Sequence, residues 1–142
     1  MPLSETSFTL LLADAARLMR HSFVDAIQGS PLTLARARVL IHLERNEGIR
    51  QVTLAERLKI QPMTLVRMID QLAREGLIER RPDPEDRRAH RLYLTKAARP
   101  QLEIIAQVGV AVREKALAGM SEAERTQTLA VLQRICRNLA AE

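Results

Sequence analysis

Residues 80–95 constrain the fold of this chain more than any other segment, because a densely charged stretch that is entered through two prolines lies there between two segments that could form strands. These segments, 77–81 and 91–94, have the length of strands. Pro82 and Pro84 restrict the backbone that leads into the charged tip, which argues against a floppy loop. The segment therefore predicts a β-hairpin.

Two short helices are predicted before the hairpin, in a helix-turn-helix pattern. Thr53 and Glu56 have the spacing of a capping box, so we expect a first helix from Thr53 to about Lys59. Pro62 suits the first position of a second helix, which would end at Gly76. Its inward-facing residues would be Leu65, Met68, Ile69 and Leu72. A helix-turn-helix followed by a basic hairpin is the order of elements in a winged helix.

Longer amphipathic helices are predicted on both sides of this centre. Two precede it, at 8–28 and from about Thr33 to Asn46. A short extended piece at 49–52 could pair with the hairpin. After the hairpin, Thr95 is expected to cap a helix that runs to about Leu117. A second capping box then opens a last helix, through Ser121 and Glu124. The predicted fold is mainly α with a small β-hairpin, of the α+β class.

The net charge of +5 is concentrated in the central third of the chain. Residues 49–99 contain twelve basic and seven acidic residues, whereas 1–48 and 100–142 each contain five of both kinds. A basic centre between neutral flanks favours a module that binds a polyanion. A solvated basic face is the alternative.

The second helix of the pattern is the candidate recognition helix. Such a helix places its N-terminal residues in the major groove, where arginine fits guanine and glutamine fits adenine. The alternative is an amphipathic helix with an ordinary polar solvent face. The predicted DNA-binding residues of this helix are Gln61, Pro62, Met63, Thr64, Arg67 and Gln71.

The hairpin tip is the candidate wing. Its arginines could reach a minor groove, which attracts arginine where it is narrow. Asp86 is unfavourable beside phosphate, so we expect it to hold one wing arginine by charge-assisted hydrogen bonds and to orient another. The alternative is a run of charge on a mobile loop. The predicted DNA-binding residues of the wing are Arg81, Asp86, Arg87, Arg88, His90 and Arg91.

Residues 49–98 resemble the MarR family of winged-helix regulators, and the flanking helices match that family's architecture in pattern. The wing motif is Asp86-Arg87-Arg88, followed by a strand that ends in Leu94-Thr95. Matches to the SlyA-type branch are Gln61-Pro62, Leu65-Val66-Arg67, Asp70-Gln71-Leu72 and Gly76-Leu77-Ile78. The chain departs from the pattern at Ala97-Ala98, where many members have glycine.

The resemblance implies a homodimer on a pseudo-palindromic DNA site, with Gln61, Thr64 and Arg67 at the major groove and Arg87 at the minor groove. The apolar faces of the outer helices also favour pairing with a second copy. The expected dimerisation residues are Phe8, Leu11, Leu12, Leu117, Leu129, Leu132, Ile135 and Leu139. The expected domains are an N-terminal dimerisation helix (1–30), a winged helix-turn-helix (31–98) and C-terminal dimerisation helices (99–142).

The resemblance further implies a small aromatic acid as ligand, bound between the dimer helices and the DNA-binding lobe. Four residues near that region could pair with its carboxylate, with ordinary ion pairs as the alternative for each: Arg17, His21, Arg38 and His42. Cys136 lies on the apolar stripe of the last helix, where we expect a small buried side chain without a redox role.

The sequence excludes several other classes of protein. No apolar run approaches the ~20 residues of a membrane span, and no signal peptide is recognisable, so we expect a cytoplasmic protein. His21, His42 and His90 have no metal-ligand spacing with Cys136, so we expect no metal. The sequence contains no catalytic constellation, no glycine-rich phosphate loop and no serine elbow, so we expect neither an enzyme nor a cofactor. The predicted function is a transcriptional regulator that binds double-stranded DNA sequence-specifically; the alternative is a winged-helix protein–protein adaptor.

Overall fold

The structure is a computed structural model that describes residues 5–141. The elements are α1 (Glu5–Ile27), α2 (Leu34–Arg45), β1 (Ile49–Arg50), α3 (Gln51–Leu58), α4 (Pro62–Arg74), β2 (Ile78–Pro82), β3 (His90–Leu94), a 3-10 turn η1 (Lys96–Ala98), α5 (Arg99–Ala116) and α6 (Glu122–Ala140). This mainly helical fold with one small sheet is the predicted fold class, which is confirmed.

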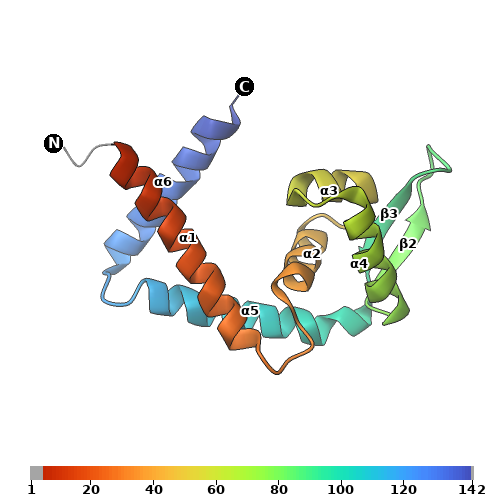
Figure 1. The fold of residues 1–142 in the computed structure, drawn as a ribbon, viewed down its shortest axis with the longest axis horizontal. Helices are drawn as coiled ribbons and strands as arrows, with labels where there is room; N and C mark the ends of the chain where they lie inside the picture. The colour runs from red at the N-terminus through yellow and green to blue at the C-terminus, as the bar shows by residue number, and fades with distance from the viewer. Residues whose placement is uncertain (1–4, 142) are drawn as a thin grey trace.

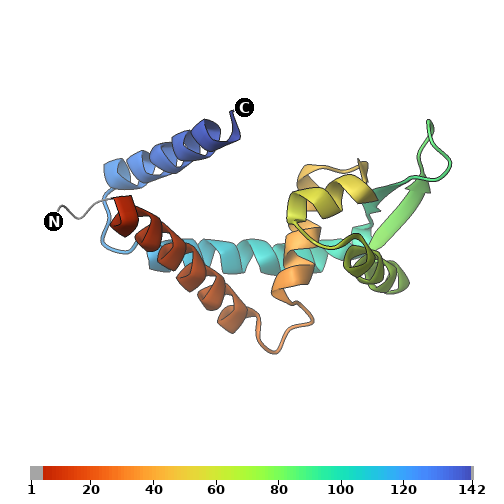
Figure 2. The ribbon, with the colours of Figure 1, turned by 45° about the horizontal axis from the view of Figure 1, so that its top comes forward.

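The molecule has two parts, a lobe and an arm (Figure 1). The lobe consists of α2, α3, α4 and the three strands, and the hairpin of β2 and β3 projects from its outer end. The arm consists of α1, α5 and α6, with α5 running out of the lobe. Figure 2 shows α6 turning back from the far end of α5, well away from the lobe.

The apolar core lies in the lobe. The three strands are antiparallel in the order β1-β3-β2, and Leu92 of the central strand faces both Ile49 and Arg80. The largest fully buried side chains are Val39, Leu40, Leu43, Leu54, Leu58, Leu65, Ile69, Leu72 and Leu92. They come from all three helices of the lobe and from β3, so one core fixes the helix-turn-helix and the sheet together.

The helix-turn-helix and the hairpin are where the sequence predicts them. Helix α4 begins at Pro62 and buries Leu65, Ile69 and Leu72. Its partner α3 ends at Leu58, and Lys59 follows in the left-handed region at φ 56°. The observed strand boundaries differ from the predicted ones by no more than one residue. Only Ile49–Arg50 of the expected extended piece pairs with β3.

Two of the three predicted helix caps are wrong. Thr53 lies inside the first turn of α3, which begins at Gln51, because the chain passes directly from β1 into the helix. The Thr95 hydroxyl donates to the Gly76 carbonyl oxygen (2.5 Å) instead of capping, and a 3-10 turn precedes α5. The capping box of Ser121 is confirmed, with hydrogen bonds of 3.0 and 3.1 Å to Glu124.

The arm leaves much of its apolar surface uncovered. Of the expected dimerisation residues, Leu117 and Ile135 are half-buried, and the others are exposed: Phe8, Leu11, Leu12, Leu129, Leu132 and Leu139. Helix α6 has no buried residue within the described part of the chain. Cys136 is therefore exposed in the single chain, contrary to the prediction.

Asp83, at the base of the hairpin tip, is the one buried charged side chain among residues 7–141. Its Oδ1 accepts from the Glu85 amide (2.8 Å), and its Oδ2 accepts from Arg50 Nε (2.6 Å) and Arg91 Nε (3.1 Å). The Glu85 amide, followed by the two guanidinium groups, lowers the pKa of the Asp83 carboxyl from 3.8 to about 2. These bonds compensate the carboxylate for the water it loses.

This depressed pKa predicts a pH-dependent stability. A carboxyl whose pKa is lower in the folded state stabilises that state above pH 3.8, and the stabilisation is lost as the pH falls through about 2. Asp83→Asn should therefore lower the midpoint of urea unfolding at neutral pH, and the difference from the wild type should shrink between about pH 5 and pH 2. Circular dichroism across that range measures it. A difference that stays constant with pH would contradict the prediction.

Candidate nucleic-acid interface

The N-terminal half of α4 presents an uncovered polar face. Because Leu65 and Ile69 point into the core, the helical period turns Thr64 and Arg67 outward, and both are exposed. Gln61, Pro62 and Met63 at the start of the helix are also exposed, and Met63 keeps 65% of its surface. Five of the six predicted recognition residues thus lie together at one end of one helix.

The C-terminal half of α4 is engaged within the protein. Gln71, the sixth predicted residue, interacts with Glu75, which also forms an ion pair with Arg36 of α2. Arg36 first, and Gln71 to a smaller extent, lowers the pKa of Glu75. Arg74 Nε donates to the Asp70 carbonyl oxygen (3.3 Å). Gln71 and Arg74 are nevertheless exposed, so the two ends of α4 differ in partners: the exposed polar side chains of α4 that have no partner within residues 5–141 lie at the N-terminal end.

The wing tip carries two arginines whose side chains have no bonding partner within the described residues. Arg87 and Arg88 are exposed, and within residues 5–141 their side chains form no hydrogen bond or ion pair. The prediction that Asp86 holds the side chain of a wing arginine is wrong. Asp86 Oδ1 accepts from the Arg88 backbone amide (2.9 Å), because an aspartate at this point of a turn reaches the amide two residues on.

The other predicted wing residues belong to the sheet. Arg81 pairs with Glu79 (3.3 Å) and lies over the Tyr93 ring, 3.9 Å from its centroid. Arg91 is bound to Asp83, and His90 is exposed on β3 opposite Pro82. The wing therefore contains two kinds of arginine: paired ones on the strands and unpaired ones at the tip.

Asp83, Arg50 and Arg80 are structurally important residues that the sequence analysis missed. Arg80 of β2 contacts both helices of the helix-turn-helix: Nη1 pairs with Asp70 Oδ1 (2.6 Å) and Nε donates to Gln51 Oε1 (3.1 Å). A signal for Asp83 was present in the sequence. An aspartate between two prolines suits a turn in which its carboxylate accepts the amide two residues later.

A mostly apolar cavity of about 310 Å³ lies between α1, α2 and α5, where the lobe meets the arm. Met19, Phe23 and Ile41 are among its lining residues, and Arg20 and Arg38 are its charged ones. Arg38 was among the predicted ligand-binding residues, and Arg20 was missed. Arg38 Nη2 also donates to the Leu58 carbonyl oxygen at the end of α3 (3.1 Å).

The other three predicted ligand-binding residues lie outside this cavity and have partners of their own. Arg17 pairs with Asp14 (3.3 Å), and His21 lies 3.5 Å from Asp25. His42 Nδ1 lies 3.0 Å from the carbonyl oxygen of Arg38. The ion pair of Arg17 with Asp14 and the contact of His21 with Asp25 match the alternative interpretation given for them from the sequence.

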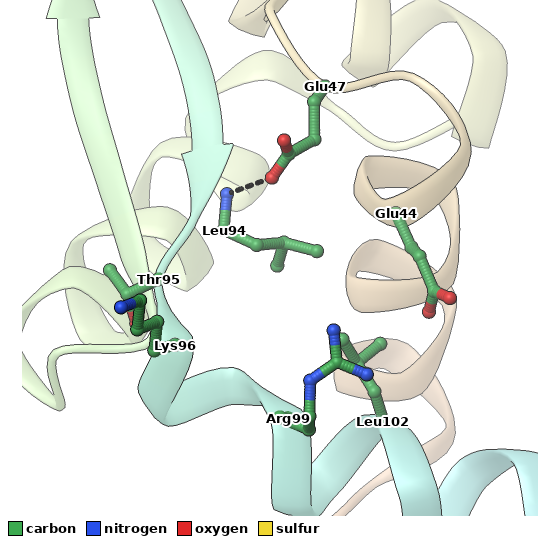
Figure 3. Close-up of a pocket in the computed structure, with 7 residues that line it drawn as sticks. All are labelled: Glu44, Glu47, Leu94, Thr95, Lys96, Arg99 and Leu102. Atoms are coloured by element: carbon green, nitrogen blue, oxygen red, sulfur yellow. Dashed lines mark hydrogen bonds between the residues drawn. The ribbon is translucent and has the colours of Figure 1, made fainter.

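A second cavity, of about 330 Å³, lies where α2, β3 and α5 meet (Figure 3). The Glu47 carboxylate accepts from the Leu94 amide (2.9 Å), which ties the end of α2 to the end of β3. Glu44 and Glu47 on one side and Lys96 and Arg99 on the other give the cavity both signs of charge. It therefore offers no uniform field to an anion or a cation.

The described residues include no cluster of three or more potential metal ligands. None of their helices is long and apolar enough to cross a membrane.

Comparison with known proteins relates this architecture to transcriptional regulators. Residues 32–90 match the model of the MarR family. The uncharacterized HTH-type transcriptional regulator YybA of Bacillus subtilis (strain 168) is 29% identical over 118 residues, which cover 82% of this chain and 79% of YybA.

Solved structures match over nearly the full length. The transcriptional regulator PA3341 is 34% identical, with a TM-score of 0.80 over 95% of this chain and 99% of that chain. Bordetella bronchiseptica BpsR, whose DNA binding is regulated by 6-hydroxynicotinic acid, is 25% identical, with a TM-score of 0.76 over 92% and 98% of the two chains. SlyA is 26% identical, with a TM-score of 0.76 over 93% of each chain. The chain belongs to the MarR family and is a winged helix-turn-helix, DNA-binding transcriptional regulator rather than an enzyme.

Proposed function

We propose that the protein binds a pseudo-palindromic double-stranded DNA site as a homodimer. The observation that carries the proposal is the joint exposure of the α4 N-terminus and the unpaired arginines of the wing on one lobe. Gln61, Thr64 and Arg67 would contact base edges in the major groove, and Arg87 and Arg88 would reach the neighbouring minor groove. The two recognition helices of a dimer would lie ~34 Å apart, one turn of DNA.

Substitution of the wing tip tests the DNA contact. Arg87→Ala removes one unpaired cation from each half-site, so the slope of log K against log salt should become less negative by about one unit per half-site. Fluorescence anisotropy with a duplex of the upstream region, repeated across salt concentrations, measures the slope. Lys115→Ala removes the same charge from the arm and should leave the slope unchanged.

The result can contradict the proposal in two ways. An unchanged slope for Arg87→Ala would remove this residue from the interface. If the wild-type protein fails to shift any genomic duplex at low salt, the DNA-binding function itself is wrong, and a protein–protein adaptor becomes the better interpretation.

The arm is the proposed dimer interface. Leucines on α1 and α6 are exposed, such as Leu11 with 66% of its surface and Leu129 with 59%. A contiguous exposed apolar surface of this kind is typical of a protein–protein interface. A second copy would cover it, since two-fold pairing brings the same apolar patch from each chain together. The predicted dimerisation residues on these helices and on the end of α5 are proposed to form this interface.

A charge placed in that interface should separate the copies. Leu129→Glu buries a carboxylate if the dimer forms, so the equilibrium should shift toward monomer, with DNA affinity falling in parallel. Analytical ultracentrifugation determines the mass. Gln133→Glu adds the same charge to the same helix at a position that is already polar, and it should remain a dimer. A dimer in both variants would place the interface elsewhere.

The cavity at the junction of lobe and arm is the proposed site for a small aromatic acid. Its apolar walls suit a ring, and the guanidinium groups of Arg20 and Arg38 suit a carboxylate. The BpsR relative, which responds to 6-hydroxynicotinic acid, supports this class of ligand. A carboxylate that recruits Arg38 would compete with the Leu58 carbonyl, and so could shift α3 relative to the arm.

Calorimetry with 6-hydroxynicotinic acid tests the site. Arg38→Met keeps an apolar stem but loses the charged hydrogen bonds, so ligand affinity should fall about tenfold or more. Arg17→Met removes an arginine that pairs with Asp14 outside the cavity and should bind as the wild type does. Equal losses in the two variants, or no binding to the wild type, would refute the assignment.

A further inference from the structure

We propose that the wing is fixed relative to the recognition helix before DNA binds, and that Asp83 and Arg80 are the positioning residues that fix it. The inference rests on the proposed DNA-binding function for its consequence, but not for the fixation itself. Asp83 and Arg80 do not contact DNA in this scheme. They act through the residues that they hold.

Asp83 ties the tip of the wing to the strand that precedes α3. Its side chain is fully buried, and Oδ2 accepts both from Arg50 at the end of β1 (2.6 Å) and from Arg91 on β3 (3.1 Å). The Asp83 amide donates to the Ala89 carbonyl oxygen (3.0 Å), which closes the base of the tip. A buried carboxylate with two guanidinium partners resists displacement, because separating them leaves an unpaired charge.

Arg80 ties β2 to both helices of the helix-turn-helix. It pairs with Asp70 of α4 (2.6 Å), donates from Nε to Gln51 of α3 (3.1 Å), and donates from Nη2 to the Val66 carbonyl oxygen (3.4 Å). The two sets of contacts end on adjacent residues, Arg50 and Gln51, where β1 becomes α3. The wing is therefore fastened to the start of α3 by two adjacent anchors, and through Arg80 also to the middle of α4.

This arrangement sets the distance between the two DNA contacts. The hairpin lies beside α4 at the outer end of the lobe (Figures 1 and 2). Gln61, Thr64 and Arg67 are exposed on α4, and Arg87 and Arg88 are exposed on the hairpin. If α4 and the hairpin form one rigid unit, docking of α4 in the major groove places the tip arginines at the minor groove without a further ordering cost.

The proposal predicts an effect opposite in sign to simple electrostatics. Asp83→Asn makes the wing more positive and releases Arg50 and Arg91, so charge alone would tighten DNA binding. Loss of positioning instead should weaken it, by about tenfold or more at fixed salt. Glu85→Gln is the matched control, since it removes the same charge two residues away while its backbone amide can still donate to Asp83. It should bind as tightly as the wild type, or more tightly.

Hydroxyl-radical footprinting at saturating protein supplies the readout that a merely less stable protein would not change. For Asp83→Asn, protection of the outer minor grooves should be lost while the central major-groove contacts persist in methylation interference. If Asp83→Asn does not fold, Arg80→Lys tests the same point at constant charge, with Arg74→Lys on the exposed face of α4 as its control. Affinity equal to or above that of the wild type, or a complete footprint in the Asp83 and Arg80 variants, would overturn the proposal.

Backbone ¹⁵N relaxation on the DNA-free dimer separates this proposal from the proposed function. Order parameters at residues 84–89 should fall in Asp83→Asn and stay unchanged in Glu85→Gln, with α4 unaffected in both. A wild type that binds no DNA would refute the function, and the relaxation data would still decide the fixation of the wing. Unchanged order at 84–89 in Asp83→Asn would refute the fixation, whatever the DNA result.

Discussion

The burial of Leu65, Ile69 and Leu72 under α4 is the interaction on which the remainder of the structure depends. Full burial of such a side chain contributes roughly 1.5–3 kcal/mol, so these three fix the rotation of the helix about its axis. Once that rotation is fixed, the 3.6-residue period leaves Thr64 and Arg67 no direction except outward. The position of the proposed base-contacting residues, Thr64 and Arg67, thus follows from the packing of the core.

The wing is organised by charge pairing rather than by apolar burial, because its positive and negative charges nearly balance. Residues 74–91 contain six arginines and five acidic residues. In the structure the acids neutralise the arginines on the strands, as Glu79 does for Arg81 and Asp83 for Arg91, and leave those of the tip unpaired. An unpaired cation keeps its whole charge for a phosphate. In the proposed DNA complex, the acidic residues would therefore determine which arginines are free to contact a phosphate.

The parts of this architecture with a local signal could be predicted from the sequence. The apolar period of α4 and the hairpin entered through Pro82 and Pro84 are of this kind, and so is the capping box of Ser121. The cap expected at Thr53 failed because pairing of β1 with β3, forty residues away, decides where α3 begins. Asp86 and Asp83 both accept the amide two residues on, so only burial in the folded lobe separates the turn former from the ion-paired anchor.

One continuous helix of the arm, α5, joins the arm to the lobe. α5 begins beside the sheet and ends beside α6. In the proposed dimer, a rotation of the lobe about α5 would therefore change the separation of the two recognition helices. The cavity between α1, α2 and α5 lies at that junction, and Arg38 there reaches the end of α3. A lobe that is rigid from wing to recognition helix transmits such a rotation whole, because none of it is absorbed inside the unit. Rigidity in the lobe would therefore make a small displacement at the junction sufficient to misplace both DNA contacts together.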